Sequence, residues 1–446
     1  MNSETKIVRH IPCIITAALV SLLAFLFNST CYSEDITKAL SISEGLKLAT
    51  ENSRIIKIVS YNKDISLADT LVAKSRFFPS IDISANQTFL QYQPGAFFGS
   101  QSVFTAEKES LSYGINVYHT IYDFGARTSL YDASKLSLNV TELDIERIKN
   151  LVALDFITAY LDLLKTDKLI LIAQKEVEMF GSHLKLAQSF YEEGVITKND
   201  LLQAEVKLSD AKQQLLTTKN LKAINTARIN NILSLPLTNE VQAIDISGDL
   251  PFSFELCNAW EAASKQRPEF KIIDNQIKIN YLEESAKKSE YYPSLYAQGG
   301  YNYTENRYLL HEDNWSLILG INFNLFNGGS TRAEVSKLKY IKNQLLEQKE
   351  KLLDDVKLEV EKSYLEMKIA DEKIQVTKDA INQAEENLRI NKIKYEEGIG
   401  TATDVIDAIT LLTKAETNYY TALYEFRQAQ AGLMYSIGFD LVSAYK

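Results

Sequence analysis

The chain has 446 residues, of which 46% are hydrophobic and 24% are charged, a balance that is typical of a folded protein and excludes extended disorder. Its formal net charge of -10 argues against a nucleic-acid partner, because binding to phosphates needs clustered lysine and arginine. Only 7 prolines and 17 glycines interrupt the sequence, so its helices and strands are expected to be long.

The N-terminus has the pattern of a secretory signal peptide over residues 1–33. Lys6 and Arg9 form a positively charged start, residues 11–27 are apolar, and a polar run with small residues follows, which predicts cleavage at its end. A retained membrane anchor and lipid attachment at Cys31 are the alternatives, and the residues do not fix the cleavage site. Beyond this segment no stretch approaches the roughly 18 apolar residues of a membrane helix, which leaves an exported protein that is either soluble or a β-barrel.

The remaining chain contains an internal repeat, which divides it into residues 34–240 and 241–446. Two offsets relate the halves. Pro79 in FFPS and Pro293 in YYPS are 214 residues apart, whereas the positions that follow them match at 204 residues, so the first half carries about ten extra residues after its proline. The pairs that lie 204 residues apart are Tyr122 with Phe326, Tyr160 with Tyr364, and Tyr191 with Tyr395. This duplication predicts two tandem structural repeats.

Each half is predicted to begin with a helix, from Ile42 to about Phe77 and from Phe254 to about Tyr291. Both helices end at an aromatic pair and a proline, which cannot continue a helix. The pattern then changes to strict alternation, which predicts one β-hairpin at about 78–123 and another at about 292–326. In the clearest strand the apolar side chains that alternate with polar ones are Trp315, Leu317, Leu319, Ile321, Phe323 and Leu325.

These four predicted strands are about a dozen residues long, which exceeds the usual length in a soluble sheet. The length is close to the roughly nine to eleven residues that cross a bilayer at a tilt, and the alternation with aromatic ends is typical of an outer-membrane barrel. Barrels of this kind have at least about eight strands, so a barrel built from four strands per chain requires several chains. The alternative is an antiparallel sheet of a soluble domain.

A glycine turn and a very long helix follow each hairpin. From Gly329 to Tyr395 there are 66 residue steps, or about 100 Å of helix at ~1.5 Å per residue. A narrow seam of leucines recurs every seven residues, so this helix is expected to pack against neighbouring helices. Returning helices are predicted at Thr197–Leu235 and Thr401–Gly438, with turns near residues 194 and 398 between the helices of each hairpin.

Sequence motifs for catalysis are missing. The four histidines form no HExxH motif and do not cluster with cysteine, and there is no nucleotide-binding GxxxxGK[ST] motif. Asp404 and Asp407 lie three residues apart, and therefore on one helix face, but nothing near them in the sequence supplies a nucleophile or an acid partner. We therefore expect no enzymatic activity and no cofactor.

The chain resembles the TolC-type outer membrane efflux proteins over its whole mature length. The resemblance rests on the signal peptide, the duplicated halves, the FPS and YPS strand entries, the FNGG exit turn and the two YEEG tips. It implies an α+β membrane protein in which three chains each give four strands to one 12-stranded β-barrel, continued by a long α-helical barrel.

The resemblance also implies a function and a location. The expected protein is a homotrimeric channel-tunnel of a Gram-negative outer membrane, in contact with lipid and with its helices in the periplasm. It would conduct substrates from a periplasmic adaptor and an inner-membrane transporter of the RND, MFS or ABC type, in efflux or in type I secretion. The alternative function is an exported coiled-coil scaffold without a pore.

Several residues match functional positions of that family. Asp404 and Asp407 match an aspartate pair that rings the periplasmic entrance, where such a ring attracts cations and can bind a blocking divalent ion. Tyr395 and Asp200 match residues that link the inner and outer helix pairs in the closed state, and Gly400 replaces an arginine of that network. The tip residues that match the adaptor contacts are Gly194, Val195, Gly398 and Ile399.

Overall fold

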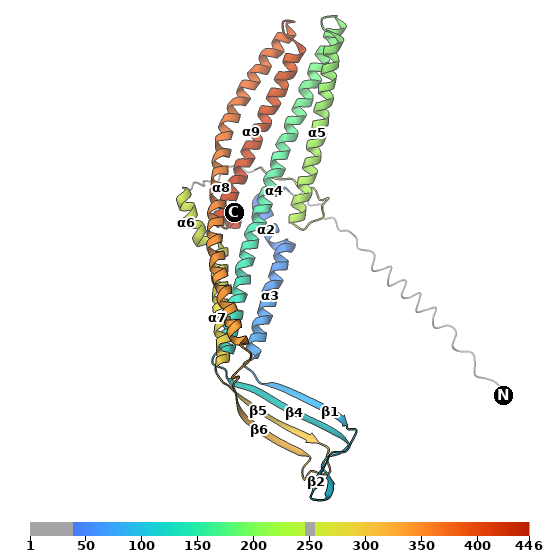
Figure 1. Cartoon of the computed structure of the whole chain (residues 1–446). Coiled ribbons are helices and arrows are strands. Elements are labelled where there is room, and N and C mark those ends of the chain that lie inside the picture. The colour runs from blue at the N-terminus through green and yellow to red at the C-terminus, as the bar shows by residue number, and fades with distance from the viewer. Residues whose placement is uncertain (1–38, 246–254, 446) are drawn as a thin grey trace, which may run out of the picture.

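The computed structural model describes residues 39–245 and 255–445, so the predicted signal peptide lies outside the described residues. The molecule is a long rod of helices with a β-sheet at one end and two helical tips at the other (Figure 1). Within the described ranges no helix combines the length and the apolar character that a membrane-spanning helix needs.

The main sheet has four antiparallel strands in the order β1-β4-β5-β6, as two joined hairpins. This confirms the two predicted hairpins. The last strand ends at Asn322, earlier than the alternation suggested. The strands are β1 (Ser80–Phe89), β4 (Glu109–Tyr122), β5 (Ser294–Thr304) and β6 (Asp313–Asn322).

Two further strands were not predicted. β2 (Gly95–Phe98) and β3 (Gln101–Phe104) form a small separate hairpin in the connection between β1 and β4. The prediction of two strands in this half was therefore too low, because the described residues of this half form four. The cause is length, because four residues per strand are too few to show a period of two. The hairpin lies in the stretch where the first half carries its extra residues.

Each half begins with two helices, so the prediction of one continuous helix per half was wrong. The first break is at Ser53, whose backbone is extended at φ -52° and ψ 126°. The second break is at Arg267, because a residue that precedes a proline is disfavoured in the helical region. The helices are α2 (Ile42–Asn52), α3 (Arg54–Ser75), α6 (Leu256–Gln266) and α7 (Pro268–Lys288), which continues into a short 3₁₀ turn, Ser289–Tyr291.

The long helical hairpins match the prediction closely. Gly125 and Gly329 have positive φ values of 88° and 83° and lead into helices of 67 residues each. Those long helices are α4 (Ala126–Glu192) and α8 (Ser330–Glu396), the returning helices are α5 (Lys198–Ile232) and α9 (Ala402–Ile437), and a short α10 (Leu441–Ala444) follows.

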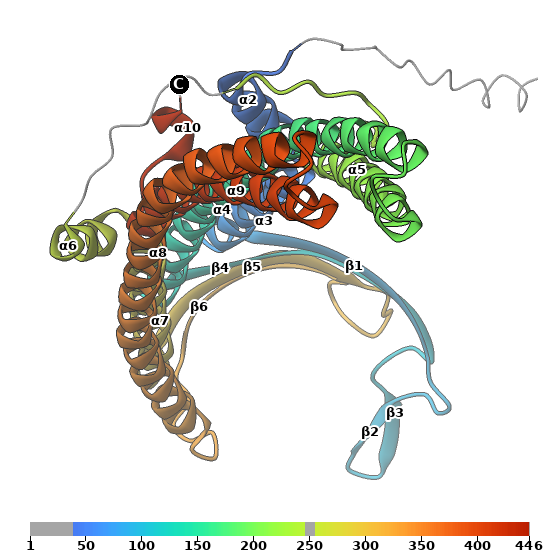
Figure 2. The same cartoon turned by 90° about the horizontal axis from the view of Figure 1, so that it is seen from above.

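The helices form one curved layer and not a closed bundle. In the tip half, neighbouring helices follow the order α5-α4-α9-α8, and in the sheet half they follow α3-α4-α7-α8. Figure 2 shows this layer as an arc, and the sheet curves in the same sense. The layer therefore has two open flanks, one with β1, α3 and α5 and the other with β6 and α8.

The core is densest where the helices of the two halves cross, a region that we call the waist. Phe156 and Tyr160 on α4 are fully buried there. The Tyr160 hydroxyl lies 2.8 Å from the carbonyl oxygen of Leu40 and 2.7 Å from that of Ile244, and it accepts a hydrogen bond from the Ile244 N–H. The waist thus ties the start of the first half to the segment after α5.

Candidate functional site

Both helical tips use the same glycine turn. Gly194 and Gly398 have the same φ of 74°, and the next N–H bonds back to the helix, with Val195 at 2.8 Å from Phe190 O and Ile399 at 2.9 Å from Lys394 O. Glycine is required because this left-handed conformation penalises a side chain. Val195 and Ile399 are exposed, so each tip presents an apolar side chain to its surroundings.

A capping box follows each turn. The Asp404 carboxylate accepts hydrogen bonds from the Thr401 hydroxyl at 2.6 Å and the Thr401 N–H at 3.0 Å, while the Asp404 N–H donates to the Thr401 hydroxyl. These bonds from Thr401 hold the pKa of Asp404 below its usual value. Thr197 and Asp200 make the same box at the other tip, with distances of 2.7 and 3.0 Å. Asp404 and Asp200 are therefore equivalent helix-capping residues.

Asp407 is different, because no partner occupies its carboxylate within the part of the chain that the structure describes. It is exposed one turn further along α9 and borders a groove of about 360 Å³ between α5 and α9. Gln203 and Lys207 line the opposite wall. Of the two predicted gate carboxylates, Asp407 is the one that is free to meet an ion.

Tyr395 lies where the two helical hairpins meet. Its side chain is only 2% exposed, and its ring centre lies 5.2 Å from that of His183 and 5.3 Å from that of Phe190, both on α4. Burial, together with the nearby Asp200 carboxylate, raises the pKa of the Tyr395 hydroxyl. That hydroxyl has no hydrogen-bond partner among the described residues, so Tyr395 joins the hairpins by packing and does not bond to Asp200.

Gly400 fills a tight position at the second tip. Its N–H donates to the Lys394 carbonyl at 2.9 Å, and a Cβ there would be 3.0 Å from the Tyr395 nitrogen. A side chain at this position, arginine included, would need Lys394 or the Tyr395 backbone to move by a few tenths of an ångström. Sequence reasoning noted the missing arginine but not this steric reason for glycine.

No role was singled out from the sequence for His183, one of the four histidines. The structure places it on the inner face of α4, beside Tyr395, with 5% exposure. Its only sequence signal is a lone histidine on a buried helix face, which is more often a core residue than a functional one.

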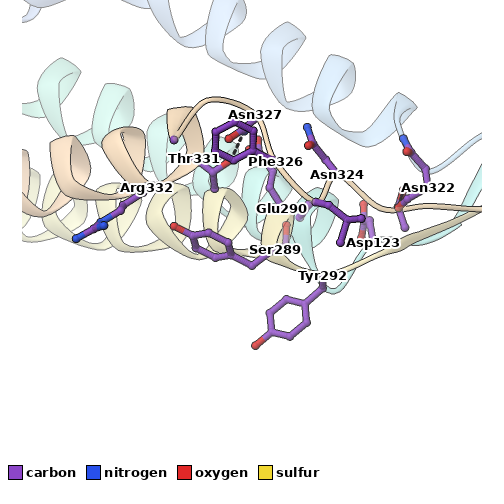
Figure 3. A pocket seen from close by; sticks show the side chains of 15 residues that line it. Asp123, Ser289, Glu290, Tyr292, Asn322, Asn324, Phe326, Asn327, Thr331 and Arg332 are labelled. Atoms are coloured by element: carbon purple, nitrogen blue, oxygen red, sulfur yellow. Dashed lines mark hydrogen bonds between the residues drawn. The ribbon is translucent and has the colours of Figure 1, made fainter.

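A polar junction connects the sheet to the helices at the opposite end (Figure 3). Thr331, in the first turn of α8, donates to the Glu290 carboxylate at 2.9 Å and accepts from the Asn327 amide at 2.7 Å. These bonds line a cavity of about 350 Å³ and fix the start of the long helix, as expected for a turn. In the described ranges, no group of histidine, cysteine and acidic residues could hold a metal ion.

The sequence matches the family described as outer membrane efflux protein over residues 45–234 and 284–438. The chain belongs to this family. The matched ranges include both helical tips and all four strands of the main sheet.

Solved structures of outer-membrane channels share the fold of this outer membrane efflux protein at low identity. The outer-membrane channel OprN has a TM-score of 0.78 at 17% identity, with 90% of each chain covered. The Campylobacter jejuni CmeC outer membrane channel has a TM-score of 0.77 at 15% identity, covering 90% of this chain and 86% of that one. The open state of the Neisseria gonorrhoeae MtrE outer membrane channel has a TM-score of 0.72 at 15% identity, covering 90% of this chain and 89% of that one.

Proposed function

We propose that this outer membrane efflux protein is a homotrimeric exit duct that crosses the outer membrane and extends through the periplasm. Substrates would enter from a periplasmic adaptor and an inner-membrane transporter of the RND, MFS or ABC type, for efflux or for type I secretion. Conduction through the duct is passive, so the transporter supplies the energy. The observation that carries this proposal is the pair of open flanks on the curved helical layer.

The two flanks suit head-to-tail contact between copies of the chain. β1 and β6 are the edge strands of the main sheet, and each presents unpaired backbone groups that another strand can bond. A contact between unlike surfaces of identical chains generates a ring when the rotation closes. Because barrels need about eight strands or more, two copies would only just suffice, whereas three give the twelve that the family resemblance implies.

Apolar side chains continue these edges along the helices. Both flanks carry stripes at helical spacing that would be unfavourable in water over such a length. On the first flank the exposed residues are Ile55, Ile58, Ile65 and Val72 of α3 and Leu216 and Ile224 of α5. On the second flank they are Leu358, Leu365, Ile369 and Val376 of α8. Contact between copies would bury both stripes.

One face of the sheet is suited to lipid. Side chains of β6 that alternate along the strand are apolar and highly exposed, with Trp315 at 75% and Leu317 at 76%. On the other face Asn116 and Asn302 lie against each other at 3.4 Å. This separation of apolar and polar faces favours a sheet with lipid outside and water inside.

At the opposite end, three copies of Asp407 and Asp404 would ring the entrance. Asp407 is the primary cation site of that ring, since Asp404 also caps α9, and a divalent ion bound there would block the bore. The tip residues Gly194, Val195, Gly398 and Ile399 form the adaptor-docking surface. Tyr395, Asp200 and Gly400 hold the two hairpins of a protomer in position. We further propose that residues 34–240 and 241–446 are tandem repeats.

The proposal is tested by the size and location of the protein. Membranes are fractionated, and the purified protein is run on a denaturing gel with and without heating. A trimer in the outer-membrane fraction that dissociates on heating is expected. Ile369→Glu on the α8 stripe should prevent the trimer, whereas the control Lys368→Glu, on an exposed position of the same helix, should not. A soluble periplasmic monomer would refute the duct.

A further inference from the structure

The seam between the α4–α5 hairpin and the α8–α9 hairpin changes in character toward the tips. At the waist, the Gln428 amide donates to the Asp162 carboxylate at 2.9 Å. Further along, Lys175 on α4 pairs with Glu416 on α9 at 2.5 Å. From there to the tips, the described residues form no further hydrogen bond or ion pair between the two hairpins, so contact depends on packing.

This packed part of the seam surrounds a cavity of about 270 Å³. His183 enters its wall from α4 and Tyr395 from α8, and their rings lie 5.2 Å apart at 50°. His183 Nε2 and the Tyr395 hydroxyl are both buried and both lack a hydrogen-bond partner among the described residues. Buried polar atoms without partners weaken a contact, so the two atoms make this part of the seam easy to open.

No carboxylate among the described residues forms a hydrogen bond or an ion pair with His183. The titratable groups that line the cavity with it are Lys175 and Glu178 on α4 and Lys392 and Tyr395 on α8. Next to these, Asp200 on α5 acts on Tyr395. Glu416 is paired with Lys175, and the α9 residues that line the cavity itself are Val405 and Ile409. The unpaired charges in the wall, one lysine and one glutamate, offset each other. Burial therefore lowers the pKa of His183.

We propose that His183 is a gate-positioning residue. In its neutral form it keeps the α8–α9 hairpin packed against α4, and in its protonated form it drives the two hairpins apart at the tips, which opens the duct. The inference rests on the proposed function, since it assigns a regulator to the entrance of that duct.

Proton linkage gives the direction of the effect. A histidine exposed to water titrates near about pH 6.5, and the buried one in the closed seam titrates lower. The separated hairpins therefore bind the proton more tightly, and a fall in pH through about 6.5 favours opening. Above that pH His183 is neutral in both states, so a change in pH no longer shifts the opening equilibrium. Each pKa unit between the states corresponds to a tenfold bias per protomer, by about 1.4 kcal/mol per unit.

The test measures conductance of the purified protein in planar lipid bilayers from pH 7.5 to pH 5.5. In wild type the opening equilibrium should shift toward the open state by about tenfold per protomer for each pKa unit of difference, which is read as a rise in open probability. His183→Phe keeps a ring in the seam without titrating, and His183→Asn introduces the residue type found 204 positions later, at Asn387. Both variants should lose the rise. His311→Phe, in the exposed loop between β5 and β6, is the matched control and should keep it.

A second measurement separates this inference from the proposed function. Nitroxide labels are attached at Val195→Cys and Ile399→Cys, in a Cys257→Ser background, and the tip-to-tip distance is measured by pulsed electron paramagnetic resonance. The distance should lengthen at pH 5.5 in wild type and stay fixed in His183→Phe. An acid-induced rise or lengthening that survives in His183→Phe would overturn the inference. Absence of any channel at any pH, with the distance change intact, would instead refute the duct.

Discussion

A close contact at the waist predicts that Gly45→Ala destabilises the protein when Phe156 is present and stabilises it when the Phe156 ring is removed. A Cβ added at Gly45 on α2 would lie 2.1 Å from Cζ of Phe156 on α4, whose ring is fully buried. Gly45→Ala therefore overpacks the core, at a cost of about 3 kcal/mol, the upper end of the usual range. Alanine also improves the helix by about 1 kcal/mol, so the net loss should be about 2 kcal/mol.

Removing the ring should reverse the sign. In a Phe156→Val background, Gly45→Ala meets no ring and should stabilise the protein by about 1 kcal/mol. The second half already carries this combination, since Ala259 and Val360 occupy the positions 214 and 204 residues later and pack in one cluster. The prediction therefore also tests the proposed tandem repeat at the level of packing.

The double-mutant cycle is measured by urea denaturation in detergent micelles, followed by the helical circular dichroism signal. The coupling between the two substitutions should be about 3 kcal/mol. Ala259→Gly in the second half is the control and should cost about 1 kcal/mol in helix propensity and about 0.8 kcal/mol for the buried methyl group. Equal destabilisation by Gly45→Ala in both backgrounds would show that the ring is not the cause.

Two further predictions concern the entrance and the waist. Asp407→Asn should reduce cation preference and divalent block in bilayers more than Asp404→Asn does. The asparagine at position 404 can still accept the capping bonds from Thr401, so both variants keep the helix start intact. Equal effects would contradict the assignment of Asp407 as the primary site. Tyr160→Phe should lower the free energy of unfolding in urea by about 1–3 kcal/mol, because it leaves buried backbone groups without a hydrogen-bond partner. The control Tyr364→Phe, whose hydroxyl makes no hydrogen bond in the described structure, should lower it by less than about 1 kcal/mol. Similar losses in both variants would show that the lost hydrogen bonds are not the cause.

Local sequence patterns predicted the parts of the fold that repeat over many residues. The alternation around Trp315 and the glycines near residues 194 and 398 located the hairpins and the tips, because periodicity and positive φ leave direct marks in a sequence. The two broken helices escaped the prediction. Pro268 marked the second break, and no comparable residue marks the first at Ser53, where the chain turns to pack against α4.

The candidate site was predicted less completely, since its roles depend on contacts between distant segments. The sequence paired Asp404 with Asp407 as equals. The capping box that distinguishes Asp404 is local, and its partner Thr401, three residues earlier, was overlooked. His183 carried no motif, because its significance comes from a ring of α8 more than 200 residues away. A sequence can show that a side chain lies on a buried face, but not which side chain it meets.

The two tips have the same backbone conformation and differ in the side chains that contact the opposite hairpin. Tyr395 is buried at 2% exposure, whereas Tyr191, its counterpart 204 residues earlier, is 40% exposed. Gln203 stands where Asp407 would be expected in the first tip, while the capping residues Asp200 and Asp404 are alike. Under the repeat hypothesis, the shared residues build the turn and the differing ones build the gate. A gate assigned from the repeat alone would therefore select the capping residues, whereas the packing between the hairpins points to Tyr395 and His183, the residues that we propose to act in opening the duct.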